Sequence, residues 1–241
     1  YSTFGFDDYK VDLSVRDTAG DGKFVGSDDL WGLAEQGLID ALERHGIPYD
    51  RVEGEAAFYG PKIDIQVADA IGRMWQLTTI QVDFNLPERF DISYEAEDGT
   101  RKRPVMVHRA IFGAMERFFA VLTEHFAGAF PVWLAPVQVV VVPIADRHVA
   151  YCTDVADRLI DAGLRVDIDQ RAERMNRKIR DAQLQKIPYM LIAGDRDIEA
   201  EQVSVRLRTG GDVGGQSVEQ FLTSVMPIVE SRDPVDLGFS S

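Results

Sequence analysis

The stretch KIDIQVADAIGRMWQLTTIQVDF, residues 62–84, sets the expectation for the first half of the chain. Apolar and polar residues alternate over 62–67 and again over 75–84, and this two-residue period is typical of strands with one buried face. The same alternation continues over 90–95, and 104–108 has the composition of a further strand. We therefore predict an antiparallel sheet built from these segments.

Two segments around this sheet have the spacing of helices. Asp28 and Asp29 precede apolar residues that recur every three or four positions, up to a stop signal at 46–48. A second run with helical spacing extends from Ile111 to Phe126. The first part of the chain is thus expected to be α+β, with an antiparallel sheet flanked by helices.

The pattern changes after 128–136, which contain a glycine and two prolines. Residues 137–144 form a nearly continuous β-branched run, as in a strand buried on both faces. The expected elements that follow are a helix over 147–162, a strand over 164–168, a basic helix over 173–185, strands over 189–193 and 202–208, and a helix over 217–230. This order predicts an α/β domain with right-handed crossovers. We place the domains at 1–135 and 136–232, followed by a frayed tail at 233–241.

Composition excludes several classes of protein. The 241 residues carry a net charge of −14, which argues against a generic nucleic-acid-binding protein, and no DNA partner is expected. The single cysteine, Cys152, excludes an internal disulfide framework and fits a reducing compartment. No apolar run reaches the roughly 18–20 residues that span a bilayer, and no signal peptide is visible. We expect a cytoplasmic protein without a membrane partner, with anion binding sought at the basic clusters 101–109 and 171–186.

Two segments of the first domain allow both a functional and a purely structural interpretation. The turn Tyr59-Gly60-Pro61-Lys62 is either ordinary turn punctuation or a device that places a phenol and an ammonium at the mouth of the sheet. Thr79, Gln81 and Asp83 share one strand face. That face is either solvated or a hydrogen-bonding floor for a substrate.

Three further features allow similar alternatives. His108 at a strand end is structural or a ligand, and no paired cysteine or histidine stands at metal-binding spacing. Arg117 is a surface charge or a contact to a purine or a phosphate. The basic segment 174–180 is a solvated face or a docking site for a polynucleotide backbone. The glycine-rich segment 210–215 predicts a flexible turn, and it lacks the residues of a phosphate-binding loop.

Four segments, taken in order, resemble one family. They are AFYGPKIDIQ (57–66), GRMWQLTTIQVDFNLPERF (72–90), PVMVHRAIFGAMERF (104–118) and FPVWLAPVQV (130–139). Together they look like threonyl-tRNA synthetases of bacterial type, which are class II aminoacyl-tRNA synthetases. The resemblance runs from about Tyr1 to Glu230. It implies the C-terminal part of a catalytic domain, including motif 3, followed by an α/β anticodon-binding domain with a mixed sheet.

The resemblance also implies an activity. This is ATP-dependent activation of threonine to threonyl-adenylate and transfer to tRNA(Thr), with Mg²⁺ accompanying ATP and with a homodimer as the assembly. Motif 1, motif 2 and two of the three zinc ligands have no counterpart here, so the 241 residues alone are expected to be inactive. The alternatives are a non-catalytic tRNA-binding module and a regulatory paralogue that binds protein partners.

Site residues follow from the same resemblance. His108 matches a zinc ligand, and zinc in this family selects threonine through its amino and hydroxyl groups. The residues expected to act in catalysis are Lys62, Gln81 and Arg117. Those expected to line the threonine and adenylate pocket are Tyr59, Gln76 and Thr79. Those expected to contact anticodon bases are Arg174, Asp197 and Arg206.

Overall fold

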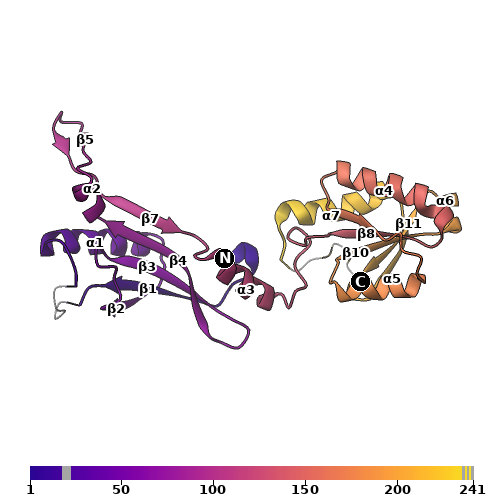
Figure 1. Cartoon of the computed structure of the whole chain (residues 1–241), viewed down its shortest axis with the longest axis horizontal. Helices are drawn as coiled ribbons and strands as arrows, with labels where there is room; N and C mark the ends of the chain where they lie inside the picture. Colours follow the sequence, from indigo (N-terminus) through magenta and orange to yellow (C-terminus); the bar gives the residue numbers. More distant parts are fainter. Residues whose placement is uncertain (18–22, 235–236, 238, 240–241) are drawn as a thin grey trace. The chain divides into compact units, whose positions relative to one another are not determined.

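The computed structural model describes residues 1–17, 23–234, 237 and 239 (Figure 1). The chain forms two compact units, Phe6–Glu124 and a second unit of His125–Ser241 with Tyr1–Gly5. The boundary expected between residues 135 and 136 stays a prediction. In the part of the chain that the structure describes, no helix is both long and apolar enough to cross a bilayer.

The first unit is a five-stranded sheet with strand order β2-β1-β3-β4-β7. Only the β1–β2 pair is parallel, and the other pairs are antiparallel, as the alternation predicts. Its elements are β1 (Tyr9–Val15), α1 (Asp28–Arg44), β2 (Asp50–Glu53), β3 (Lys62–Ala68), β4 (Met74–Asp83), α2 (Asn85–Arg89), β5 (Tyr94–Glu95), β6 (Arg101–Lys102), β7 (Met106–Ala110) and α3 (Met115–His125).

Helix α1 covers the apolar face of this sheet (Figure 1). Its Ser27 side chain accepts a hydrogen bond from the Leu30 amide, which caps the amino end. Trp31 is fully buried and lies edge-on to Phe24 and Phe84, at centroid distances of 5.5 and 5.9 Å. The opposite face of the sheet is left to the polar side chains of the strands.

The second unit is a mixed sheet with strand order β12-β11-β10-β8-β9. Strands β9, β8 and β10 run parallel, while β11 and β12 are antiparallel, so the expected α/β domain with a mixed sheet is confirmed. Its elements are β8 (Val139–Pro143), α4 (Val149–Asp161), β9 (Val166–Ile168), α5 (Met175–Leu184), β10 (Tyr189–Ala193), α6 (Asp195–Glu199), β11 (Val203–Leu207), β12 (Asp212–Gln216) and α7 (Val218–Ser231).

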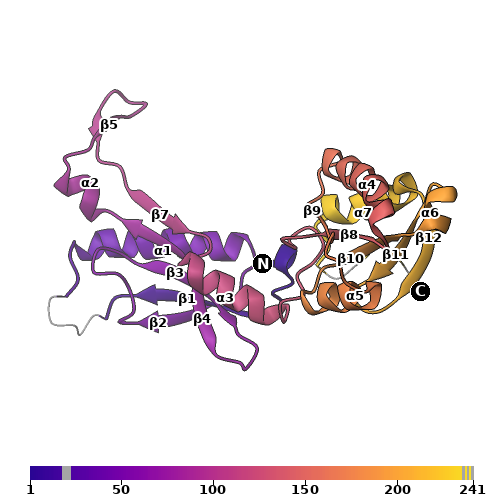
Figure 2. The same cartoon turned by 45° about the vertical axis from the view of Figure 1, so that its right-hand side comes forward.

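Strand β8 is buried along its whole length because helices cover both of its faces. Alternate residues of β8 belong to two apolar clusters, one containing side chains of α4 and α7 and the other containing side chains of α5. Figure 2 shows α4 and α5 on opposite sides of this sheet. Ser217 caps α7 in a capping box with Gln220, as its position in the sequence predicts.

Three local predictions are wrong. The strand expected over 90–95 is reduced to β5, because Phe90 ends helix α2. Residues 212–215 of the turn expected over 210–215 belong to strand β12 (Asp212–Gln216), which pairs with β11. The tail expected to be frayed contains Leu237 and Phe239, which pack on the second core, and Leu237 O accepts a hydrogen bond from Tyr189 Oη at 2.8 Å. Residues 235–236, 238 and 240–241 of that tail lie outside the described residues.

Candidate functional site

One face of the first sheet carries a row of polar side chains that crosses four strands. Ser14 of β1 pairs with Lys62 of β3, Lys62 pairs with Gln81 of β4, and Gln81 pairs with His108 of β7. Residues that pair directly across strands point to the same face of a sheet. Strand pairing therefore gathers Lys62, Gln81 and His108, which the sequence analysis singled out from separate segments.

The carboxylate of Asp64 is the hub of this face, and the residue is only 5% exposed. Its Oδ2 accepts hydrogen bonds from Ser14 Oγ at 3.0 Å and from Lys62 Nζ. Its Oδ1 accepts from Thr79 Oγ1 at 2.8 Å and from Gln76 Nε2 at 2.5 Å. One buried carboxylate thus binds three of the predicted site residues at once.

The turn before β3 places Tyr59 beside this network. The Tyr59 hydroxyl donates to Gln81 Oε1 at 2.5 Å. Burial, with a contribution from the negative charge of Asp83, raises the pKa of the Tyr59 phenol, so it remains a donor at neutral pH. The turn lies tightly against β4, because a Cβ at Gly60 would stand 1.8 Å from the Val82 carbonyl oxygen. Glycine is therefore required for this approach.

His108 is held by a second buried carboxylate. Its Nε2 lies 2.9 Å from Asp83 Oδ2, and Asp83 is 0% exposed. The other oxygen, Oδ1, accepts from the backbone amides of Asn85 and Leu86 at 2.8 and 3.0 Å, which also begins helix α2. The orientation of the imidazole is thus fixed from inside the sheet, while the His108 side chain remains 42% exposed.

This arrangement suits one ligand of a zinc ion. A carboxylate behind a histidine is the usual partner that orients a metal-binding imidazole, and the contact to Asp83 leaves Nδ1 of His108 for a metal. A catalytic zinc needs about three protein ligands. Among the described residues no group of three or more histidine, cysteine and acidic side chains is placed to hold a metal. The described residues therefore supply one ligand and its carboxylate partner, but not a complete set.

Arg117 lies on α3 and contacts strand β4. Its Nη1 donates to the backbone oxygen of Gln76 at 2.8 Å, and its guanidinium stands 5.8 Å from the ring centroid of Trp75. Arg73 lies over the same ring at 5.6 Å. The contact to β4 places the Arg117 charge next to the strand that carries Gln76 and Thr79.

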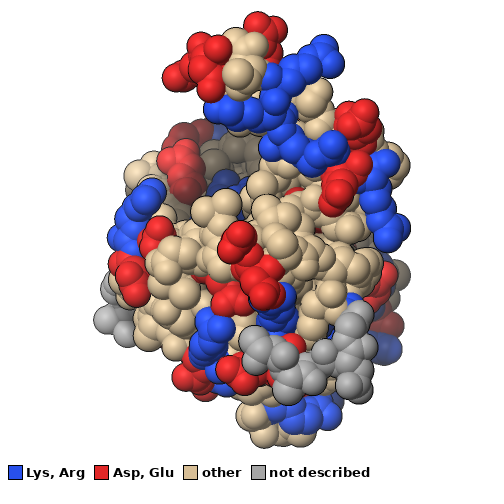
Figure 3. Space-filling view, turned by 90° about the vertical axis from the view of Figure 1, so that its left-hand side faces the viewer, with Lys and Arg blue, Asp and Glu red and all other residues tan. Residues whose placement is uncertain are grey.

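The basic cluster at 101–109 is largely balanced by acidic neighbours. Lys102 pairs with Asp98 at 2.9 Å, and Arg103 pairs with Asp91 at 3.1 Å while it also donates to two backbone carbonyls of α2. On the face drawn in Figure 3, acidic and basic side chains are interspersed. Lys102 therefore stabilises the turn of the β5–β6 hairpin, and Arg103 is held against α2.

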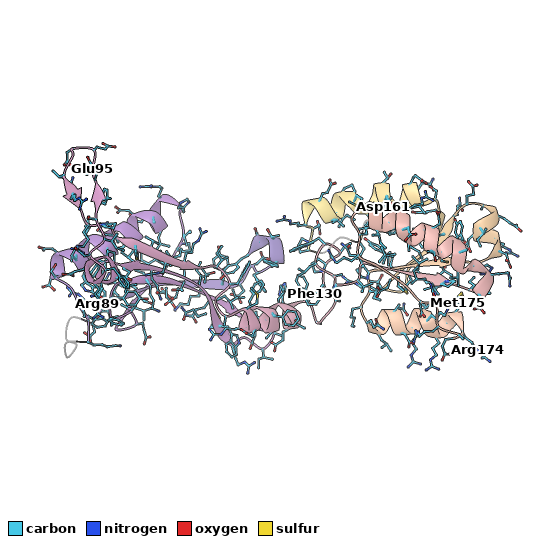
Figure 4. The ribbon with its side chains drawn as sticks, turned by 45° about the horizontal axis from the view of Figure 1, so that its top comes forward. Arg89, Glu95, Phe130, Asp161, Arg174 and Met175 are labelled. Atoms are coloured by element: carbon cyan, nitrogen blue, oxygen red, sulfur yellow. The ribbon has the colours of Figure 1, made fainter. Side chains whose placement is uncertain are left out.

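The three predicted anticodon contacts lie in the second unit. Arg174 is exposed at the beginning of α5, where Figure 4 labels it beside Met175. Arg206 is half-buried on β11 and lies 3.4 Å from Asp212. Asp197 accepts hydrogen bonds from the Gly194 amide at 2.9 Å and from Ser204 Oγ at 2.7 Å. Ser204 and Arg206 share one face of β11, so Asp197 and Arg206 are on the same side of the sheet.

A cavity of about 260 Å³ lies at the carboxyl ends of β8 and β9. The loops that follow these two strands line it, and Ala172, Glu173 and the buried Lys178 contribute side chains. In open α/β sheets, ligands bind where neighbouring strands send their loops to opposite faces. Arg171 is the arginine that lines this cavity, and Arg174 follows the lining residue Glu173 in the chain.

Sequence reasoning missed Ser14, Asp64 and the role of Asp83. A signal for Asp64 was present, since it stands two residues from Lys62 and so shares its strand face. A signal for Ser14 was present as well, since apolar and polar residues alternate over 9–15, but strand β1 was not predicted. The donors that surround Asp64 come from three strands, and their convergence is a product of strand register.

Two family models match the chain. Residues 1–126 match the model described as "tRNA synthetase class II core domain (G, H, P, S and T)", and residues 138–226 match "Anticodon binding domain". The first match covers more than half of the chain.

Known proteins match over nearly the whole chain. The chain is 54% identical over 231 residues to a threonine–tRNA ligase of Acidobacterium capsulatum, which covers 96% of this chain and 34% of that protein. It is 53% identical over 233 residues to a threonine–tRNA ligase of Natranaerobius thermophilus, with coverages of 97% and 36%. The chain thus spans about a third of the length of these curated relatives.

A solved structure of a threonyl-tRNA synthetase also matches nearly the whole chain. The structure described as the RNA binding domain of threonyl-tRNA synthetase from Cryptosporidium parvum superposes with a TM-score of 0.84 at 35% identity, over 98% of this chain and 57% of that one. With a class II core, an anticodon-binding domain and these relatives, the chain belongs to the threonyl-tRNA synthetase family of class II aminoacyl-tRNA synthetases.

Proposed function

We propose that this chain is part of a threonine–tRNA ligase, which activates threonine with ATP and transfers it to tRNA(Thr). The observation that carries the proposal is the convergence of Tyr59, Lys62, Gln76, Thr79 and Gln81 on one polar sheet face. These are the residues that match the threonine and adenylate pocket. The face offers both donors and acceptors, as recognition of an amino acid and its adenylate requires.

The proposed roles follow from charge and position. Attack of a threonine carboxylate oxygen on the α-phosphorus of ATP, which is bound with Mg²⁺, forms the threonyl-adenylate and expels pyrophosphate. Negative charge develops on the α-phosphate oxygens in the transition state. The charges of Lys62 and Arg117 stabilise it electrostatically. Gln81, fixed by Tyr59, positions the adenylate. Gln76 and Thr79 contact threonine.

His108 supplies one zinc ligand in this proposal, and the remaining ligands come from other parts of the full-length enzyme. Zinc, when bound, is a Lewis acid whose open positions favour an amino acid with both an amino and a hydroxyl group. The chain's own contribution is the His108 imidazole, oriented by Asp83.

The second unit is proposed to read the anticodon of tRNA. Unstacked loop bases are the accessible features of an RNA loop. The cavity at the ends of β8 and β9, Arg174 at the beginning of α5 and Arg206 on β11 support this role. The proposed enzyme is a cytoplasmic homodimer with a catalytic part at 1–135 and an anticodon-binding part at 136–232.

The test is threonine-dependent exchange of pyrophosphate into ATP, measured with the full-length protein. We expect exchange with threonine and none with valine, and we expect the 241-residue chain alone to show none. Absence of exchange in the folded full-length protein, together with salt-sensitive tRNA binding, refutes the ligase and indicates a non-catalytic tRNA-binding module.

A further inference from the structure

Asp64 occupies the centre of the polar sheet face, yet no expectation from sequence or family resemblance gave it a role. We propose that Asp64 is a positioning residue, which determines the hydrogen-bonding atoms that Lys62, Gln76 and Thr79 present to an amino acid substrate. This inference rests on the proposed function, because the substrate is taken to be the threonine of that reaction.

An ionised carboxylate accepts hydrogen bonds and donates none. Every group that contacts Asp64 must therefore turn a donor toward it. The Gln76 amide directs its NH₂ group at Oδ1, and the Thr79 hydroxyl directs its proton at the same oxygen. The Lys62 ammonium and the Ser14 hydroxyl do the same at Oδ2.

Because these donors are directed at Asp64, a defined set of hydrogen-bonding atoms on the same side chains remains for a ligand. Gln76 retains its carbonyl oxygen Oε1, and Thr79 retains oxygen lone pairs, so both act as acceptors. An α-ammonium group or a substrate hydroxyl is a matching donor. Lys62 has three N–H donors and directs one at Asp64, which leaves two for carboxylate or phosphate oxygens. The face is thereby polarised for a zwitterionic amino acid or its adenylate.

The neighbouring strand provides a matched control. Asp12 pairs directly with Asp64 across β1 and β3, lies on the same face and is equally buried at 5% exposure. Its partners are Lys10 at 2.9 Å and Gln66 at 2.5 Å, and neither residue belongs to the predicted site. Asp12→Asn therefore removes an equivalent buried charge without removing a contact to Gln76, Thr79 or Lys62.

The experiment compares Asp64→Asn with Asp12→Asn in the full-length protein by threonine-dependent pyrophosphate exchange. Asparagine keeps the size of the side chain but turns an NH₂ group toward donors that need an acceptor. We expect the threonine KM of Asp64→Asn to rise about tenfold or more, the effect of losing a hydrogen bond to a charged group. The ATP KM should change less than about threefold, as should both constants of Asp12→Asn.

A second readout does not depend on activity. In the 241-residue chain, Lys62 Nζ should be acylated faster by an amine-directed reagent in Asp64→Asn than in the unsubstituted chain, because the Asp64 carboxylate no longer holds it. The rate is followed by mass spectrometry of the peptide. Asp12→Asn should leave the Lys62 rate unchanged. If Asp64→Asn does not fold, Ser14→Ala is the second variant, because it removes a donor to Asp64 and leaves the Asp64 carboxylate in place. It should raise the threonine KM about threefold, less than Asp64→Asn does, because Asp64 keeps its donors Lys62, Gln76 and Thr79.

The possible failures are distinct. An unsubstituted protein without exchange refutes the proposed function. An active protein whose threonine KM is unchanged in Asp64→Asn, or in Ser14→Ala where Asp64→Asn does not fold, overturns the positioning role. An equal rise of the threonine KM in Asp12→Asn also overturns it, since burial of charge would then account for both effects.

Discussion

Replacement of Gly60 by alanine tests the close approach that places Tyr59 beside Gln81. An added Cβ would lie 1.8 Å from the Val82 carbonyl oxygen and 3.0 Å from the carbonyl carbon, and both are backbone atoms of β4. A contact of 3.0 Å or more therefore requires the turn to move by about 1.2 Å or more. The Val82 amide donates to the Pro61 carbonyl at 3.0 Å, and this bond cannot survive such a shift.

Overpacking of a tight contact costs about 1–3 kcal/mol, and the lost backbone hydrogen bond costs about 0.5–1.5 kcal/mol. We therefore expect Gly60→Ala to lower the free energy of unfolding of the first unit by about 2–4 kcal/mol. The assay is urea unfolding of the 241-residue chain, followed by circular dichroism and tryptophan fluorescence. In the full-length protein the displaced Tyr59 should also weaken threonine-dependent exchange.

The matched control is Gly32→Ala in the exposed part of α1, where a Cβ would have no atom within 4 Å. Alanine is a better helix former than glycine by about 1 kcal/mol, so this substitution should stabilise the unit slightly. The same glycine-to-alanine change is thus expected to lower the free energy of unfolding at position 60 and to raise it at position 32. A Gly60→Ala chain as stable as the unsubstituted chain would show that the turn does not lie against β4 as described.

Three further predictions address other parts of the molecule. His108→Ala in the full-length protein should lower zinc content, measured by atomic absorption, and threonine activation together, whereas retained zinc would contradict the ligand role. Arg206→Ala should weaken tRNA binding and aminoacylation while pyrophosphate exchange stays within about twofold, since only contacts in the second unit are removed; equal loss of both would indicate misfolding. Hydrogen bonds from Trp75 and Arg73 hold the pKa of Asp69 well below its usual range. The ionised Asp69 carboxylate therefore stabilises the folded chain fully above about pH 4, and this stabilisation is lost as the pH falls through the lowered pKa. The difference in melting temperature between the unsubstituted chain and Asp69→Asn should therefore narrow between pH 6 and pH 2, and a constant difference would refute this linkage.

Helices and strands were predicted accurately where the signal lies within a few consecutive residues. The helix expected after Asp28 is observed as Asp28–Arg44, and the strand expected over 189–193 is observed with the same bounds. Both signals are contained in a few consecutive residues. The β8 strand was also expected from its run of β-branched residues, because helices on both faces of a strand favour an apolar run of this kind.

Elements whose stability comes from distant partners were missed. Strand β12 contains three residues of weak strand propensity, Asp212, Gly214 and Gly215, yet it pairs with β11. The strand expected over 90–95 failed for a related reason. Asp83 accepts the amides that begin α2, and this side-chain bond redirects the chain before Phe90.

By itself, the sequence determined the fold class, the order of the two domains and the family, because periodicity and contiguous motifs are local properties of the chain. Only the tertiary structure decided which polar residues act together. Ser14 and Asp64 are 50 residues apart, and they meet because the register of β1 on β3 places them on one face. The network around Asp64 forms because a buried carboxylate must be supplied with donors, and strand pairing determines which residues supply them.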